Sequence, residues 1–352
     1  MSNCVKNERE VNFDILRSLA IMAVIAIHST YSGWQWYGDL GGSWNYYFTL
    51  IIKQFYCFAV PSFFFMSGYF FSSKMGNDWK KETEHIVKRM ERILVPYLVW
   101  SVIVFFIVKG KKNIVIFLND LLSGKVVGAY YYIIVLAIFT LLSPLLVRLK
   151  DKSYGLMLVL LINTINIVVV YFYRIKLGHN FNWWYAAFPF TTWISFYYFG
   201  ILYRYGKVPR FILNIQPKKA MAIVLAMLFL SLFEAFALVS LWGQYSGAAS
   251  SSKFSSFLYS FSIIIFFISI RKLDLWFPYI LKVISSYSFG IYLIHEIIRG
   301  GLVRYVFGAA LEDVQPVLQL LVFSSTLFLS ILVICIAKEM IPNHICTKYL
   351  GF

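Results

Sequence analysis

Residues 316–337 read PVLQLLVFSSTLFLSILVICIA, a stretch without a charged side chain. A helix needs about 20 mostly apolar residues to cross the hydrocarbon core of a bilayer. Similar apolar runs recur along the chain, at 12–32, 50–72, 93–108, 129–147, 154–173, 188–203, 220–241, 257–270 and 283–298. The sequence therefore predicts an all-α polytopic membrane protein with about ten transmembrane helices.

The composition of the whole chain points to the same class. Of its 352 residues, 60% are hydrophobic and 14% are charged, and the mean hydropathy is +0.71. Ordinary soluble domains contain about 45–50% apolar and about 25% charged residues. These values exclude a soluble, a disordered and a disulfide-stapled secreted chain. No internal repeat or low-complexity linker divides the sequence, so we expect one membrane domain over residues 1–352.

The chain carries a strong positive charge, +16, from 32 Lys and Arg against 16 Asp and Glu. In a soluble protein this surplus would favour nucleic-acid binding. In a polytopic protein, Lys and Arg instead gather in short cytoplasmic loops. When the N-terminus is placed inside, most of these residues fall in inside loops. We therefore expect both termini to face the cytoplasm, and no nucleic-acid partner.

The first apolar run contains two polar residues that a simple membrane anchor would not need, Arg17 and His28. They are 11 positions apart, about 20° past three full helical turns, so they share one face with an axial separation of about 16 Å. Charge within a span marks a functional site by default. The spacing predicts that this face lines a cavity crossing much of the membrane. Alternatively, Arg17 reaches the interface with Asp14 as its partner, and His28 lies among the outer headgroups.

Two further features combine polar residues with membrane helices. Arg89 and Arg92 share a helix face at the predicted cytoplasmic boundary, and paired guanidinium groups suit a polyanion such as a nucleotide phosphate. Ordinary positive-inside anchoring would produce the same pattern. In the run 283–298, His295 precedes Glu296 and is either functional or a hydrogen-bonded interhelical histidine. Neither an HExxH, a P-loop nor a GxSxG pattern occurs, so we expect no metal and no bound cofactor.

Four segments together resemble the acyltransferase 3 family of integral membrane O-acyltransferases. They are FDILRSLA at 13–20 with Arg17 and His28 as an Arg-x10-His pair, VPSFFFMSGY at 60–69, RMERILVPY at 89–97 and SYSFGIYLIH at 286–295. The likeness extends over almost the whole chain. It departs on the fourth span, where many members carry His-x-Trp-Phe-Leu and this chain reads AYYYI, with Ala129 in place of the histidine. This departure casts doubt on a catalytic role for the segment and is consistent with a different acceptor.

The resemblance implies transfer of an acyl group, usually acetyl, from cytoplasmic acetyl-CoA to a hydroxyl of a cell-surface polysaccharide or its lipid-linked precursor. The expected partners are acyl-CoA as co-substrate, the glycan acceptor and membrane lipids. The expected location is a bacterial cytoplasmic membrane, in a stand-alone form without the esterase-like domain of longer members. The rival hypothesis is a polysaccharide exporter or flippase, which needs no CoA site.

The resemblance also assigns roles. His28 is the implied general base for the sugar hydroxyl, because imidazole titrates near neutral pH. Arg17 is implied to hold part of the donor or to form a proton network with Asp14, and Arg89 and Arg92 are implied to bind the donor phosphates. Supporting roles are expected for Ser67, Ser286, Ser288, His295 and Glu296.

Overall fold

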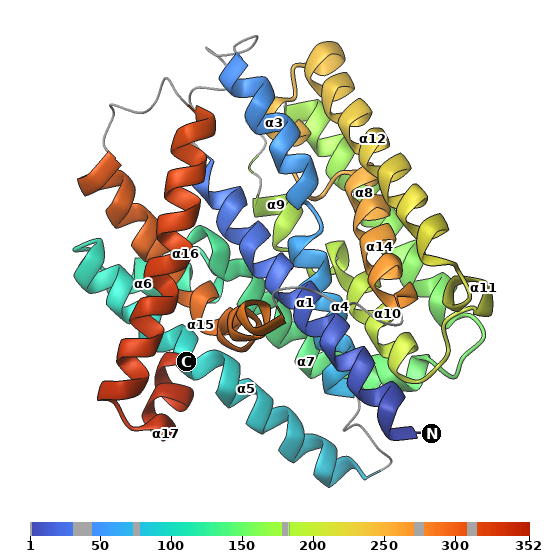
Figure 1. Cartoon of the computed structure of the whole chain (residues 1–352), viewed down its shortest axis with the longest axis horizontal. Coiled ribbons are helices and arrows are strands. Elements are labelled where there is room, and N and C mark those ends of the chain that lie inside the picture. Colours follow the sequence, from blue (N-terminus) through green and yellow to red (C-terminus); the bar gives the residue numbers. More distant parts are fainter. Residues whose placement is uncertain are drawn as a thin grey trace.

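The computed structural model is all-helical throughout the residues it describes, which are 2–30, 44–72, 78–177, 182, 184–270, 278–307 and 315–352, with 2–10, 246, 278 and 315 described by their backbone alone. The longer helices are α1 (Ser2–Ser29), α3 (Trp44–Tyr56), α4 (Ala59–Ser72), α5 (Trp79–Val102), α7 (Tyr131–Leu149), α8 (Gly155–Leu177), α10 (Ile194–Arg204), α12 (Pro217–Trp242), α14 (Phe254–Ser269), α15 (Pro278–Leu302) and α16 (Gln315–Met340) (Figure 1). The shorter elements are η1 (Ile103–Val108), α6 (Ile114–Leu122), η2 (Gly128–Tyr130), α9 (Trp184–Ala187), η4 (Phe190–Thr192), α11 (Arg210–Leu213), α13 (Tyr245–Ala248), η5 (Val303–Phe307), α17 (Asn343–Ile345) and η7 (Cys346–Leu350).

The predicted all-α membrane class is confirmed. Seven helical stretches are long and apolar enough to cross a membrane, namely Val11–Ser29, Trp44–Ser72, Trp79–Val108, Gly128–Leu149, Gly155–Leu177, Pro217–Trp242 and Pro316–Met340. The other three predicted runs coincide with α10, α14 and α15. The first two are only 11 and 16 residues long, whereas α15 has 25 residues but contains several charged side chains. The predicted run 12–32 ends at residues 31 and 32, which lie outside the described part of the chain.

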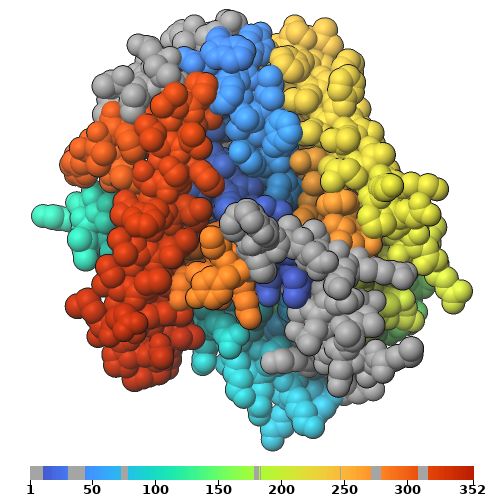
Figure 2. All heavy atoms as spheres, in the orientation of Figure 1, coloured from blue at the N-terminus to red at the C-terminus, as the bar shows by residue number. Residues whose placement is uncertain are grey.

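The spanning helices differ in how much of their surface other helices cover. In α1, 61% of the apolar window is buried, against 22% in each of α8, α12 and α16. The stripe Leu225, Phe229 and Phe233 on α12 is largely exposed, and its four-residue spacing places it on one helix face. Such a stripe suits the hydrocarbon of a bilayer. In the space-filling view, α3, α12 and α16 form the surface around α1, of whose described residues little emerges (Figure 2). The central helix is therefore the one that carries Arg17 and His28.

Helices α4 and α10 approach each other at backbone distance. A Cβ at Gly68 would lie 2.1 Å from the carbonyl oxygen of Tyr197, and one at Gly200 would lie 2.0 Å from that of Phe65. No side chain can fit at either position, since real Cβ contacts are longer than 3.0 Å. The glycine of the SGY segment thus serves helix packing, and it turns the adjacent Ser67 toward the centre of the molecule.

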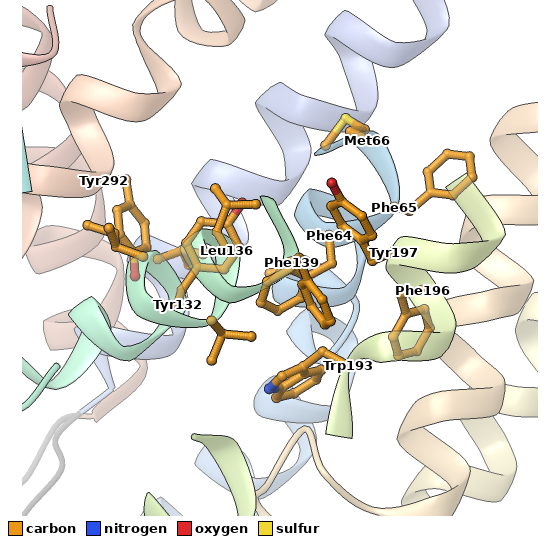
Figure 3. Close-up of a cluster of buried hydrophobic side chains, with 14 of the residues drawn as sticks. Phe64, Phe65, Met66, Tyr132, Leu136, Phe139, Trp193, Phe196, Tyr197 and Tyr292 are labelled. Carbon is orange, nitrogen blue, oxygen red and sulfur yellow. The ribbon is translucent and has the colours of Figure 1, made fainter. Parts of the chain in front are cut away.

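An aromatic cluster fixes α7 against α4 and α10. The ring of Phe139 on α7 lies 5.3 Å from that of Phe64 and stacks on that of Tyr197 at 4.7 Å, and Trp193 stacks on Phe64 at 5.9 Å (Figure 3). Aromatic pairs at such separations stabilise a core beyond their buried area. The cluster sets the position of the N-terminal end of α7, where the AYYYI segment begins.

Helix α15 lies between α1 and α7, near the middle of Figure 1. On one side, Ser18 Oγ donates to the carbonyl of Leu281 at 2.5 Å. On the other side, the Tyr130 hydroxyl donates to the carbonyl of Leu293 at 2.7 Å, and the Tyr292 hydroxyl donates to the carbonyl of Ala129. These bonds hold the SYSFGIYLIH segment against both the Arg-x10-His helix and the AYYYI segment.

Candidate active site

A first cavity of about 340 Å³ opens between α1, α4, α5, α7 and α15. We call it the arginine cavity because Arg17, Arg89 and Arg92 all line it. Its other polar lining side chains are Ser67, Tyr132, Ser285, Ser286, Ser288 and Tyr292, and the remainder are apolar. None of the described lining residues is an acid, so the wall of this cavity is strongly cationic and suits an anion.

Arg17 is held by its neighbours rather than reaching out to the interface. Its Nη1 lies 3.3 Å from Asp14 Oδ1 and 3.4 Å from Ser285 Oγ, and Ser285 in turn donates to Asp14 Oδ1 at 2.9 Å. The guanidinium carbon also sits 5.2 Å from the ring centroid of Phe70. Asp14 itself does not line the cavity. Its role in this geometry is to orient Arg17.

Arg89 and Arg92 reach the cavity from one face of α5. The Arg89 guanidinium lies 5.3 Å over the ring of Phe71, and its buried Nε has no hydrogen-bond partner among the described residues. Arg92 is more exposed. Proline and tyrosine of the adjoining ILVPY segment serve packing instead: Tyr97 donates to the carbonyl of Leu121 at 2.5 Å. The i,i+3 spacing thus places two guanidinium groups beside the one from α1.

A second cavity of about 320 Å³ lies at the other end of the Arg17–His28 face. We call it the histidine cavity. Its charged and titrating wall residues include His28, Lys53, Arg174, Glu296 and Arg299. Further lining comes from Val24, Ile27, Cys57, Val60, Gly128, Ala129, Tyr131, Ala187, Gly247, Ala249, Ser250, Ser251, Ser252 and Tyr292.

His28 and Glu296 form the closest polar pair in this cavity. His28 Nδ1 lies 2.7 Å from Glu296 Oε1, and Arg299 donates to Glu296 Oε2 through Nη2 at 2.9 Å and Nε at 3.2 Å. A proton on Nδ1 directed at the carboxylate leaves Nε2 as the basic nitrogen of the His28 ring. This arrangement is that of a general base oriented by an acid.

His295 lies behind this pair and lines neither cavity. Its side chain is fully buried, its ring is 5.3 Å from that of His28, and its Nδ1 is 2.7 Å from the carbonyl of Tyr292. Donor atoms of His28, His295 and Glu296 fall within 4.8 Å of one another, a spacing that a metal ion could bridge. The hydrogen bonds from His28 and Arg299 satisfy the carboxylate without a metal ion, so the sequence expectation of no metal stays a prediction.

The spacing of Arg17 and His28 predicts one cavity, but the described residues enclose two. Tyr292 lines both. Its hydroxyl donates to the carbonyl of Ala129, and its ring makes an edge contact with Tyr132 at 5.4 Å; Tyr132, Leu136 and Tyr292 lie together in Figure 3. The prediction of a continuous pathway was therefore wrong in this respect: the side chain of Tyr292 stands between the two ends.

The supporting serines differ in their surroundings. Ser67 and Ser288 lie in the wall of the arginine cavity. Ser286 lies there too, but its hydroxyl bonds to carbonyls of its own helix at 2.7 and 3.1 Å. The sequence analysis missed Ser285 and Tyr292, although both stand in or beside the SYSFGIYLIH segment. It also missed Arg299, which the i,i+3 spacing from Glu296 could have revealed.

The family model described as an acyltransferase domain matches residues 10–338. The chain belongs to the acyltransferase 3 family. Family membership implies acyltransferase activity in a multi-pass membrane protein. In this acyltransferase 3 chain, all four recognised segments reach one or both cavities. The departure from the family pattern also falls there, since Ala129 lines the histidine cavity. No curated protein and no solved structure matches the chain.

Proposed function

We propose that this acyltransferase transfers an acetyl group from cytoplasmic acetyl-CoA to a hydroxyl of a cell-surface polysaccharide or its lipid-linked precursor, in the cytoplasmic membrane of a bacterium. The observation that carries the proposal is the pair of cavities of different chemistry that share Tyr292 as a wall. One is a cationic cavity suited to a polyanionic donor. The other holds an imidazole oriented by a carboxylate.

The arginine cavity is the proposed donor site. Coenzyme A carries several phosphate charges, and planar guanidinium forks bind phosphate oxygens through two parallel hydrogen bonds. Arg89 and Arg92 supply such forks, and Arg17 is fixed beside them by Asp14. The proposal places the N-terminal end of α1 at the cytoplasmic face, where acetyl-CoA is available. The bias of Lys and Arg among the loops supports this orientation.

The histidine cavity is the proposed acceptor site. His28 Nε2 accepts the proton of the sugar hydroxyl while the oxygen attacks the thioester carbonyl. The new ester C–O bond forms as the C–S bond breaks, and the departing CoA thiolate takes the proton from His28. Glu296, fixed by Arg299, stabilises the imidazolium that exists between these two proton transfers. Because Tyr292 separates the cavities, its side chain lies where the thioester must meet the hydroxyl.

The test is proton NMR of the surface glycan from a strain in which the gene is deleted. We expect O-acetyl signals to disappear on deletion and to return with the wild-type gene but not with His28→Ala. An exporter would instead change the amount of surface glycan and leave its acetyl content per sugar unaltered. Unchanged acetylation in both the deletion strain and the His28→Ala strain would contradict the proposal.

A further inference from the structure

The histidine cavity has a net positive charge in the part of its wall that the structure describes. Lys53, Arg174 and Arg299 line it, and Glu296 is the one acid among its described lining residues. Arg299 pairs with Glu296 at 2.9 Å, so Lys53 and Arg174 give the described wall its excess of charge. Cations within a membrane protein are costly and mark pathways for charged ligands. Transfer to a neutral sugar would not need them.

Both excess cations are deeply buried. Lys53 on α3 is 5% exposed, and Arg174 on α8 is 2% exposed. Arg174 Nη2 donates to Ser252 Oγ at 3.0 Å. A Cβ at Gly247 would come within 2.8 Å of the Arg174 Cδ, so only glycine lets α13 pack against this side chain. The guanidinium is thus fixed in the cavity wall instead of extending to the membrane interface.

The chemistry of these groups defines their ligand. A guanidinium fork fits the two oxygens of a carboxylate or phosphate, and an ammonium adds a compact point charge. The cavity volume of about 320 Å³ is within the range of small-ligand pockets, about 300–1,000 Å³. His28 stands in the same wall. One bound molecule can therefore place its anionic group at Arg174 and Lys53 and its hydroxyl at His28.

We propose that the acceptor of this acyltransferase is anionic and that Arg174 and Lys53 bind its charged group. This inference rests on the proposed function and names the class of acceptor. The anionic group has two possible sources, the carboxylate of an acidic sugar or the phosphate that joins a glycan to its lipid carrier. The two sources share the chemistry that the cavity recognises.

The experiment uses purified full-length protein in nanodiscs, radiolabelled acetyl-CoA and a glycolipid extract from the deletion strain as acceptor. One portion of the extract has its carboxylates converted to neutral methylamides, and another has its glycan released from the lipid phosphate by mild acid. Wild type is compared with Arg174→Gln, Lys53→Gln and the charge-retaining Arg174→Lys. Lys176→Gln, two positions further along α8 and exposed, is the matched control. Size-exclusion profiles and thermal unfolding report on the fold of each variant.

We expect one of the two treatments to lower the wild-type kcat/KM by about 10- to 100-fold, the effect of losing a hydrogen bond to a charged group. The effective treatment identifies the source of the charge. Arg174→Gln should lose a similar factor on the untreated extract and nothing further on the treated one, with the KM for acetyl-CoA unchanged. Arg174→Lys should retain part of the activity, and Lys176→Gln should match wild type.

Two results would overturn the inference while leaving the proposed function intact. The first is transfer by wild type that neither treatment affects. The second is an equal loss by Arg174→Gln on charged and neutral acceptors, which would make Arg174 a structural residue. If wild type transfers no acetyl group to any portion of the extract, the proposed function itself fails, and the inference with it.

Discussion

Replacing Glu296 by glutamine is the sharpest perturbation of the proposed catalytic pair. Glutamine keeps the size and one oxygen of the side chain but removes the charge that faces His28 Nδ1 at 2.7 Å. The same change weakens the two donations from Arg299. The amide can turn its NH2 group toward His28, which then has no acceptor for the Nδ1 proton and loses its preference for the productive tautomer.

The expected loss follows from these contacts. A hydrogen bond to a charged group contributes about 1.5–3 kcal/mol, or about 10- to 150-fold in rate at 1.36 kcal/mol per factor of ten. Loss of the correct tautomer adds to this, since neutralising the acid beside a catalytic imidazole can cost about 10⁴ in kcat. We therefore expect Glu296→Gln to lower kcat by between about 10² and 10⁴. The KM for acetyl-CoA should stay the same, because Glu296 does not line the arginine cavity.

The assay is release of CoA thiol by purified protein in the presence of acceptor, with exposed Glu84→Gln on α5 as the control. Glu296 acts through His28, so the double variant His28→Ala/Glu296→Gln should be no slower than His28→Ala alone. Losses that multiply in the double variant would refute the coupling between the two side chains. A kcat for Glu296→Gln equal to that of the control would refute the role of the carboxylate altogether.

Three further outcomes follow from the structure. Arg89→Ala and Arg92→Ala should each weaken acetyl-CoA binding in calorimetry, and lysine should restore it poorly because a point charge does not replace a bidentate fork; unchanged affinity in both would move the donor site elsewhere. Tyr292→Ala should join the two cavities and raise acetyl-CoA hydrolysis in the absence of acceptor, measured as thiol release, whereas an unaltered background rate would exclude a separating role. Gly68→Ala should lower the unfolding temperature by creating an overlap that typically costs about 1–3 kcal/mol, while Gly300→Ala, with nothing within 4 Å of the new Cβ, should unfold like wild type.

The membrane class and the shared face of α1 follow from the sequence, because both depend on local properties. Apolar runs of spanning length need no tertiary information, and 3.6 residues per turn fixes where Arg17 and His28 project. Both residues do line cavities. The same local logic overestimates the number of long spans, since α10 is a short helix packed against α4 at backbone distance. Its apolar composition reflects burial within the protein rather than the width of a bilayer.

The parts of the site that the sequence does not reveal depend on contacts between distant segments. Asp14 and Ser285 are 271 positions apart, and no spacing rule predicts that they hold Arg17 together. Tyr292 separates the two cavities only because its hydroxyl reaches the carbonyl of Ala129, which depends on side-chain direction. Arg174 resembles an ordinary interfacial arginine at the end of an apolar run until α13 is seen to pack on it.

The most direct test of the account is transfer of radiolabel from acetyl-CoA to the glycolipid extract by purified wild-type protein, with His28→Ala prepared in parallel. The account predicts time-dependent label in the glycan that mild base releases, as an ester requires. It also predicts a rate about 10²–10⁴ lower for His28→Ala, with acetyl-CoA binding retained. Base-labile label that accumulates equally with both proteins, or with neither, would contradict the account.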